Sequence, residues 1–179
     1  MSILITAFTI LIGIILLLLI IALFIKKEYT IERVVVINKP KTVVYDYLRL
    51  LRNHNNFIKW ALIDPNMKKE YRGTDGTVGF VSTWDSENKQ VGKGEQEIIK
   101  IQEGEKIDYE LRFIRPFEGT SYASIANVAV GEQQTRVIWV FNGKMKYPMN
   151  LMLLFMNLEK MLSRDLDEGL AKLKTILEK

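Results

Sequence analysis

Residues 3–25 form an uninterrupted apolar run, which constrains the fold of the chain more than any other feature. The run carries no charge, and 18 of its residues are Ile, Leu or Phe. At about 1.5 Å per residue, a helix of this length is roughly 35 Å long, enough to cross a hydrocarbon core of about 30 Å with some tilt. A continuous helix also satisfies its own backbone hydrogen bonds in lipid. We therefore predict a transmembrane helix from Ile3 to Ile25.

A cleaved secretory signal is the main alternative for this run. Such a signal has a basic start, a shorter apolar stretch of about 7 to 15 residues and small residues at its cleavage site. No Lys or Arg precedes Ile3, the run is longer than such a stretch, and Ala22-Leu23-Phe24 is a poor cleavage site. An uncleaved anchor is therefore the favoured interpretation.

Charge asymmetry predicts how the anchor is oriented. The basic residues that follow it are Lys26, Lys27, Arg33, Lys39 and Lys41. The positive-inside rule therefore predicts a single-pass protein of the cell membrane with its C-terminal part in the cytoplasm. The absence of cysteine is compatible with that reducing compartment.

The remainder of the chain has the size of one domain. We predict an anchor over residues 1–27 and a single domain over 28–179, since about 150 residues build one core. Without Lys26 and Lys27, the domain has 23 basic and 21 acidic residues. This balance, with no basic cluster among the aromatic residues, argues against a nucleic-acid partner.

Most of the domain reads as β-strands joined by hairpins. Tyr29 to Ile37 is rich in β-branched residues and predicts a first strand. After Asp64-Pro65, strand-like runs alternate with clusters of turn-forming residues, at 73–76, 86–89, 103–105, 116–119 and 131–134. This spacing predicts an antiparallel meander. Gly92-Lys93-Gly94 lies inside one run and predicts a bulge or bend.

Helices are predicted after the first strand and at the C-terminal end. Residues 42–51 have helical spacing, the Asn-rich stretch 53–56 breaks this helix, and a short second helix or turn leads to Trp60. From residue 151 to 177 an apolar stripe with helical period predicts one long amphipathic helix. Only the antiparallel sheet is large enough to cover that stripe, so the fold class is α+β.

This order of elements, with several stretches of sequence, resembles a known family. Residues 32–48 (ERVVVINKPKTVVYDYL) resemble the opening of the SRPBCC (START-like) superfamily. Trp60 and residues 64–98, 112–119 and 135–150 are similar to its polyketide cyclase/dehydratase-like branch, found in bacteria and including members with an N-terminal membrane helix. The resemblance implies a helix-grip fold: a curved antiparallel sheet wrapped on a long C-terminal helix, with two short helices after the first strand. It also implies, in many members, a cavity between sheet and helix.

Metal and phosphate sites are not indicated by the sequence. The chain has one histidine and no cysteine, so no His/Cys cluster can form, and no acidic loop has calcium-loop spacing. No nucleophile or phosphate-loop motif is present either. We expect no metal and no cofactor, and we expect His54, in the Asn-rich break, to be a surface or capping residue.

Two carboxylates are the candidates for general acid–base chemistry. Glu95 and Glu97 are two residues apart in a predicted strand and therefore share one face. If that face lined an apolar cavity, their pKa would be raised and they could serve as acid or base. In the alternative, supported by Lys93 on the same side, both face solvent.

Aromatic residues and methionines are the candidates for an apolar binding site, because such side chains line adaptable cavities. We expect most of them to project between the sheet and the long helix. The predicted ligand-binding residues are Trp60, Tyr71, Phe80, Trp84, Tyr109, Phe113, Tyr122, Trp139, Phe141 and Met149, with Met145, Met152 and Met156 nearby. A plain, filled core is the alternative for each of them.

Three functions stay open at this stage. The favoured one is a membrane-tethered START-like domain that binds a hydrophobic small molecule, such as a lipid, a quinone or an isoprenoid. The second is a non-catalytic accessory or scaffold subunit whose span packs on a partner membrane protein. The third is an enzyme of the cyclase or dehydratase type. Besides its ligand, the lipid bilayer is the expected partner.

Overall fold

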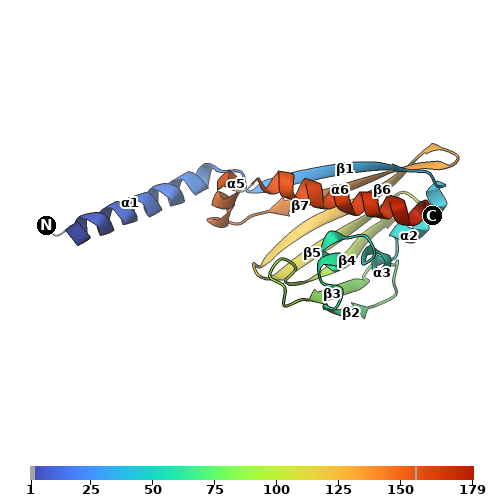
Figure 1. Cartoon of the computed structure of the whole chain (residues 1–179), viewed down its shortest axis with the longest axis horizontal. Helices are drawn as coiled ribbons and strands as arrows, with labels where there is room; N and C mark the ends of the chain where they lie inside the picture. The colour runs from blue at the N-terminus through green and yellow to red at the C-terminus, as the bar shows by residue number, and fades with distance from the viewer. Residues whose placement is uncertain (1–2, 156) are drawn as a thin grey trace.

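A projecting apolar helix precedes a sheet-and-helix domain in the computed structural model, which describes residues 3–155 and 157–179 (Figure 1). Helix α1 spans Ile3–Phe24 and is exposed along most of its length. It is the one described helix that is long and apolar enough to cross a membrane, a test that a signal sequence also passes. The predicted apolar helix is therefore present.

Seven antiparallel strands form one sheet, in the order β1-β7-β6-β5-β4-β3-β2. The strands are β1 (Glu28–Ile37), β2 (Lys68–Arg72), β3 (Val81–Asp85), β4 (Lys93–Gln102), β5 (Lys106–Arg115), β6 (Gly119–Gly131) and β7 (Gln134–Lys144). All five predicted turn clusters separate consecutive strands from β2 to β7, which confirms the meander. β1 closes the order by pairing with β7.

The sheet is curved, and a β-bulge in β4, at the Gly92-Lys93-Gly94 stretch where the sequence predicted one, contributes to this curvature. Pairing between β4 and β5 shifts register between Lys93 and Gly94 and again between Ile98 and Lys100. Gly92 has a positive φ of 67° and packs against the backbone of Arg115, so a side chain there would collide with that strand. Bulges increase local twist and bend a sheet.

The short helices differ from the prediction in where they break. They are α2 (Lys41–Leu48), α3 (Leu51–His54) and α4 (Lys59–Ile63). The helical stretch does end within the predicted break at 53–56, because α3 ends at His54, but a second break at residues 49–50, after Leu48, was not predicted. The carboxylate of Asp75, in the β2–β3 turn, accepts hydrogen bonds from the backbone N–H groups of Leu51 and Arg52, at 2.8 and 3.2 Å. This tertiary contact caps α3 and starts a new helix there.

The single long C-terminal helix was also wrong in extent. The structure has a 3₁₀ turn, η1 (Met149–Leu151), then α5 (Met152–Phe155) and then α6 (Leu158–Leu177). The side chain of Asn157 accepts a hydrogen bond from the N–H of Lys160 at 3.0 Å. Asn is among the preferred N-cap residues, so α6 starts at this point.

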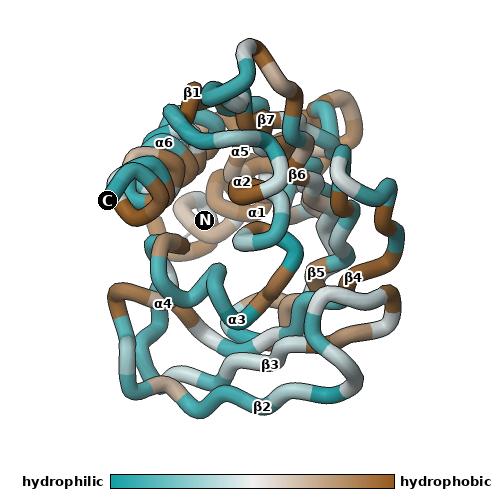
Figure 2. Tube along the Cα trace, turned by 90° about the vertical axis from the view of Figure 1, so that its right-hand side faces the viewer, coloured by the Kyte–Doolittle hydropathy of each residue, from teal (hydrophilic) through white to brown (hydrophobic). Residues whose placement is uncertain are grey.

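The core lies between the inner face of the sheet and the helices. Viewed along the long axis, the strands curl from β1 and β7 round to β3 and β2, with α6 and α4 on the open side (Figure 2). Helix α6 packs along β1 and buries Leu166, Leu170 and Leu173. The α+β helix-grip prediction is therefore confirmed.

Helix α1 is joined to the domain by side-chain and backbone contacts. The amide Nδ2 of Asn150, in η1, donates to the backbone oxygens of Ala22 and Ile25, at 2.7 and 3.2 Å. The N–H of Met145 donates to the oxygen of Lys27 at 2.7 Å. Ala22 and Asn150 are fully buried at this joint. The otherwise unpaired carbonyls at the end of α1 are thus capped by the domain.

Candidate ligand site on the inner face of the sheet

Alternation along the strands sorts the side chains into an inner and an outer face. On β5 the inner residues include Tyr109 and Phe113, and Arg112 lies between them on the outer face. Phe113 pairs with Gly94 on β4, and Gly94 pairs with Trp84 on β3, so these three residues lie on the same inner face. Inner residues of β3, β4 and β5 therefore lie in rows across one curved surface.

The end of this surface farthest from α1 is filled. Phe80, Tyr109 and Trp139 are buried, with at most 6% of their surface exposed. Each ring packs on another aromatic ring: Phe80 on Tyr71 with centroids 6.0 Å apart, Trp139 on Phe57 at 6.0 Å, and Tyr109 on the His54 imidazole at 5.5 Å. These predicted ligand-binding residues are thus placed in the packed core.

The end beside α1 is only partly covered. We call Tyr29, Trp84, Phe113 and Phe141 the proximal aromatic set; all four are inner residues of intermediate burial. Trp84 meets Phe113 edge to face at 5.9 Å, and Tyr29 lies 6.3 Å from Phe141. These pairs lie where β1 begins and where β7, β5 and β3 end, which in an antiparallel sheet is one edge, the edge from which α1 projects; Tyr29 and Phe141 are nearest to α1, and Trp84 and Phe113 lie farther across the sheet.

Small residues separate the aromatic rings at this end. Gly119 pairs with Phe113, and a Cβ atom built on Gly119 would meet no atom within 4 Å. Gly94 and Gly143 are covered instead by the rings of Trp84 and Tyr29. Aromatic side chains therefore fold over glycines on an inner surface that has free space around Gly119.

The other predicted binding residues do not join this surface. Trp60 is half-buried in α4, away from the strands. Tyr122 pairs with Glu110 and lies on the outer face, 48% exposed. Met149 lies in η1 beside α1, and Met156 lies outside the described residues. Because Ser121, Ala123 and Ser124 surround Tyr122, no alternating apolar pattern showed which face this strand buries.

Surface depressions occur elsewhere. Of the best-formed ones on the described residues, one of about 340 Å³ is lined by Lys59, Asn157, Lys160, Met161, Arg164 and Asp165. The other, of about 390 Å³, is lined by residues 25–28 at the junction of α1 and β1. Neither depression is lined by the predicted aromatic residues. The proximal aromatic set is a partly exposed surface outside both of them.

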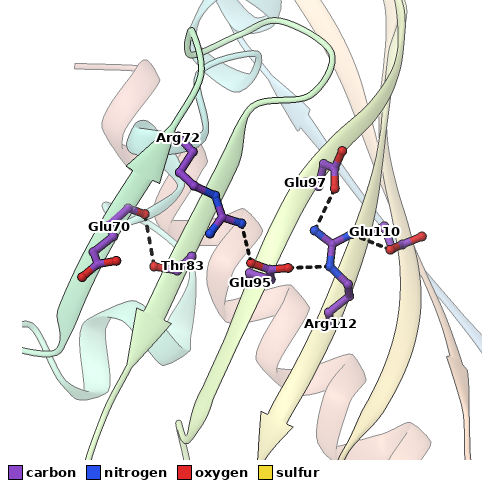
Figure 3. A network of polar contacts seen from close by, with 7 residues as sticks. All are labelled: Glu70, Arg72, Thr83, Glu95, Glu97, Glu110 and Arg112. Carbon is purple, nitrogen blue, oxygen red and sulfur yellow. Dashed lines mark hydrogen bonds and ion pairs between the residues drawn. The ribbon is translucent and has the colours of Figure 1, made fainter.

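Glu95 and Glu97 lie on the outer face, because the buried Ile98 marks the inner face of β4. Arg112 donates to Glu95 at 2.6 Å, to Glu97 at 2.7 Å and to Glu110 at 2.6 Å, as Figure 3 shows. These hydrogen bonds lower the pKa of Glu95 and raise that of Arg112. Acid–base chemistry in an apolar cavity required the inner face; both carboxylates lie on the outer face instead, bound to Arg112.

The prediction that His54 is a surface residue was wrong, because it is 4% exposed; its contact with Leu48, the last residue of α2, fits the capping alternative. Its Nε2 lies 2.9 Å from the oxygen of Leu48, and its ring packs between Phe57 and Tyr109. Burial lowers its pKa to about 4, since the charged imidazolium would lose its water. The Asn-rich sequence around it gave no sign of this burial.

A few buried polar groups were not anticipated from the sequence. Within the described part of the chain, the amide of Asn127, the hydroxyl of Tyr109 and Nδ1 of His54 have no hydrogen-bond partner. Asn127 lies on the inner face of β6, where its position among apolar residues was the one available signal. The same part of the chain holds no cluster of three His, Asp or Glu side chains suited to a metal.

These features define a class of protein: a helix-grip domain with an aromatic inner face, preceded by an apolar helix. The chain belongs to the family described as polyketide cyclase / dehydrase and lipid transport, whose model matches residues 28–178. No curated protein sequence matches it significantly.

Solved structures share the fold at low sequence identity. Norcoclaurine synthase from Thalictrum flavum, in complex with dopamine and hydroxybenzaldehyde, aligns with a TM-score of 0.61 at 11% identity, covering 84% of this chain and 86% of that one. A protein from Chromobacterium violaceum aligns with 0.59 at 15%, covering 84% and 97%. Ara h 8.0201 aligns with 0.59 at 13%, covering 84% and 97%. The chain therefore has the START-like, helix-grip fold.

Proposed function

We propose that this protein is a membrane-anchored START-like domain that binds a hydrophobic small molecule from the bilayer, such as a lipid, a quinone or an isoprenoid. Residues 1–27 serve as the anchor and residues 28–179 as the binding domain, on the cytoplasmic side. The ligand contacts the proximal aromatic set at the end of the sheet beside α1.

The anchor supports this proposal through its length, its composition and its joint with the domain. Only residues 25–27 separate α1 from β1. A connector this short, capped by Asn150, holds the near end of the sheet at the bilayer surface. A tethered domain meets a membrane-dissolved ligand at a high effective concentration. Lys26 and Lys27, directly after α1, support the cytoplasmic orientation.

The observation that supports this function best is that the inner face of the sheet is buried at one edge and partly exposed at the other. Core residues such as Tyr109 and Ile107 are sealed toward the far edge of the sheet, whereas Trp84 and Phe113 stay partly exposed at the edge from which α1 projects. Apolar side chains left half-covered around free space at Gly119 suit an apolar ligand. Their position at the edge of the sheet from which α1 projects supports an entrance on the membrane side.

The test compares two aromatic truncations on neighbouring strands. Phe113→Ala removes an inner ring, whereas Tyr122→Ala removes an outer ring. Full-length protein, purified in mild detergent, is measured by native mass spectrometry and by organic extraction of co-purified molecules. We expect Phe113→Ala to lower ligand occupancy several-fold and Tyr122→Ala to leave it unchanged.

Two outcomes would count against the proposal. Consistent recovery of empty wild-type protein after mild purification would remove the ligand-binding function. A stoichiometric partner protein in place of a small molecule would favour the scaffold function instead. Glu95→Gln adds a control, because an outer carboxylate bound to Arg112 has no route to the inner face and its loss is expected to leave occupancy unchanged.

A further inference from the structure

An exposed apolar segment lies at the joint between α1 and the domain. We call residues 147–155 the interfacial segment; it covers η1 and α5 and contains no charged residue. Its exposed side chains are Tyr147 at 42%, Met149 at 36%, Leu154 at 57% and Phe155 at 75%. Exposed to water such a cluster would be unfavourable, because hydrating large apolar side chains costs free energy.

The location of the segment indicates what covers it. Asn150, in its middle, is bonded to the last turn of α1, so the segment sits at the point where the apolar helix meets the domain. Figure 1 shows α5 directly beside the end of α1. The apolar surface of α1 and that of the segment are therefore continuous.

A second loop reaches the same side of the domain. The β5–β6 hairpin also points toward α1 in Figure 1. At this hairpin Ile114 is 46% exposed and Phe117 is 61% exposed. Two apolar tips from different parts of the sequence thus lie on the side from which α1 projects.

Positive charge flanks the interfacial segment. Lys26 and Lys27 follow α1, and Lys146 precedes Tyr147. Among the described residues none of these three lysines forms an ion pair, while Lys144 pairs with Glu28 at 2.8 Å. The depression lined by residues 25–28 opens at the same level. Lysines beside apolar side chains match the chemistry of an anionic phospholipid surface.

We propose that the interfacial segment inserts into the headgroup region of the bilayer crossed by α1, with anionic phospholipid headgroups held by Lys26, Lys27 and Lys146. This inference rests on the proposed function in one respect, since it takes α1 as a membrane span. The insertion fixes the tilt of the domain and turns the proximal aromatic set toward the lipid. Tyr147 then occupies the interfacial level at which Tyr and Trp are enriched in membrane proteins, and the apolar ring of Phe155 reaches the hydrocarbon boundary.

The experiment uses three single-cysteine variants, which the cysteine-free chain makes straightforward. Phe155→Cys reports on the interfacial segment, Ile14→Cys on the middle of α1, and Val130→Cys, 41% exposed at the far end of β6, serves as the matched control. Each carries an environment-sensitive fluorophore in full-length protein in nanodiscs of phosphatidylcholine, with or without phosphatidylglycerol, and quenching by spin-labelled lipid is measured.

We expect quenching at position 155 to be several-fold stronger than at 130 and shallower in depth than at 14. Phosphatidylglycerol should strengthen quenching at 155, and the triple change Lys26→Gln, Lys27→Gln and Lys146→Gln should abolish that increment. Equal, weak quenching at 155 and 130 with strong quenching at 14 would overturn this inference alone. Absence of quenching at 14 would overturn the membrane span itself.

One further outcome identifies a different occupant. Protection of the fluorophore at Phe155 that rises with protein concentration and shows no lipid quenching would mean that a second copy covers the segment, which overturns the proposal. If the triple lysine variant kept the phosphatidylglycerol-dependent increase in quenching, the contact between these lysines and the headgroups would be refuted.

Discussion

Protonation of His54 is expected to destabilise the folded domain as the pH falls below neutrality. The imidazole is buried between Phe57 and Tyr109, and this burial lowers its pKa to about 4, although the Leu48 oxygen and the negative charge of Asp75 oppose the shift. In the unfolded chain the pKa returns to about 6.5. Between these values the unfolded state binds more protons, so stability increases with pH. The contribution is complete above about pH 6.5 and is lost as the pH falls toward 4.

The magnitude follows from the size of this shift. One pKa unit corresponds to about 1.4 kcal/mol, so the full window is worth about 3 kcal/mol and the step from pH 7 to pH 5 about 2 kcal/mol. The assay is urea unfolding of full-length protein in mild detergent, followed by tryptophan fluorescence at both pH values. The comparison variant, His54→Gln, keeps an N–H donor for the oxygen of Leu48 but cannot titrate.

The difference in unfolding free energy between wild type and His54→Gln isolates the contribution of the His54 protonation. Wild type should lose about 2 kcal/mol more than His54→Gln between pH 7 and pH 5, because surface carboxylates titrate alike in both. A constant offset between the two proteins reflects the lost packing and does not depend on pH. Parallel pH profiles would refute the assignment of His54 as a buried neutral imidazole.

Three further perturbations test other parts of the structure. Arg112→Lys keeps the positive charge but loses the planar guanidinium that binds three carboxylates, and should lower the free energy of unfolding by about 1 kcal/mol. The loss should be smaller at high salt, because the group is partly exposed. An unchanged free energy in urea titrations would contradict the network. Asn150→Ala removes the cap on α1, worth about 1 to 2 kcal/mol, and should broaden spin-label distances between α1 and the domain while leaving domain melting unchanged. Gly143→Ala should destabilise the fold by about 1 to 3 kcal/mol, because the ring of Tyr29 covers Gly143. Gly119→Ala should be nearly neutral, because the space around Gly119 is open. Equal effects of the two variants in thermal melts would refute the stacking of Tyr29 on Gly143.

Local chemistry made the strand positions predictable. Gly, Asn and Pro clusters stop strands wherever they occur, and each of the five clusters proved to be a turn. Residues 107–113 alternate apolar and charged or polar side chains in the sequence, and in the structure Tyr109 and Phe113 lie on the inner face and Arg112 on the outer face. On β6 the small residues around Tyr122 carry no such contrast, so its outer position could not be predicted.

Contacts between distant segments decided the rest of the candidate site. Asp75 caps α3 across the fold, and the packing that buries His54 comes from α3 and β5 together. Whether an inner aromatic residue is sealed or partly exposed depends on which row of the sheet it occupies and on how far α6 covers that row. Trp139 and Phe141 are two residues apart on the same strand, yet Trp139 is buried and Phe141 is partly open.

The sequence by itself determined the apolar helix and the antiparallel meander, because length, hydropathy and turn chemistry are local properties. Only the tertiary structure decided that Glu95 faces outward onto Arg112, that the open end of the inner face lies beside α1, and that residues 147–155 remain exposed there. These outcomes depend on register and on docking, which set the environment of each side chain through residues far away in the chain.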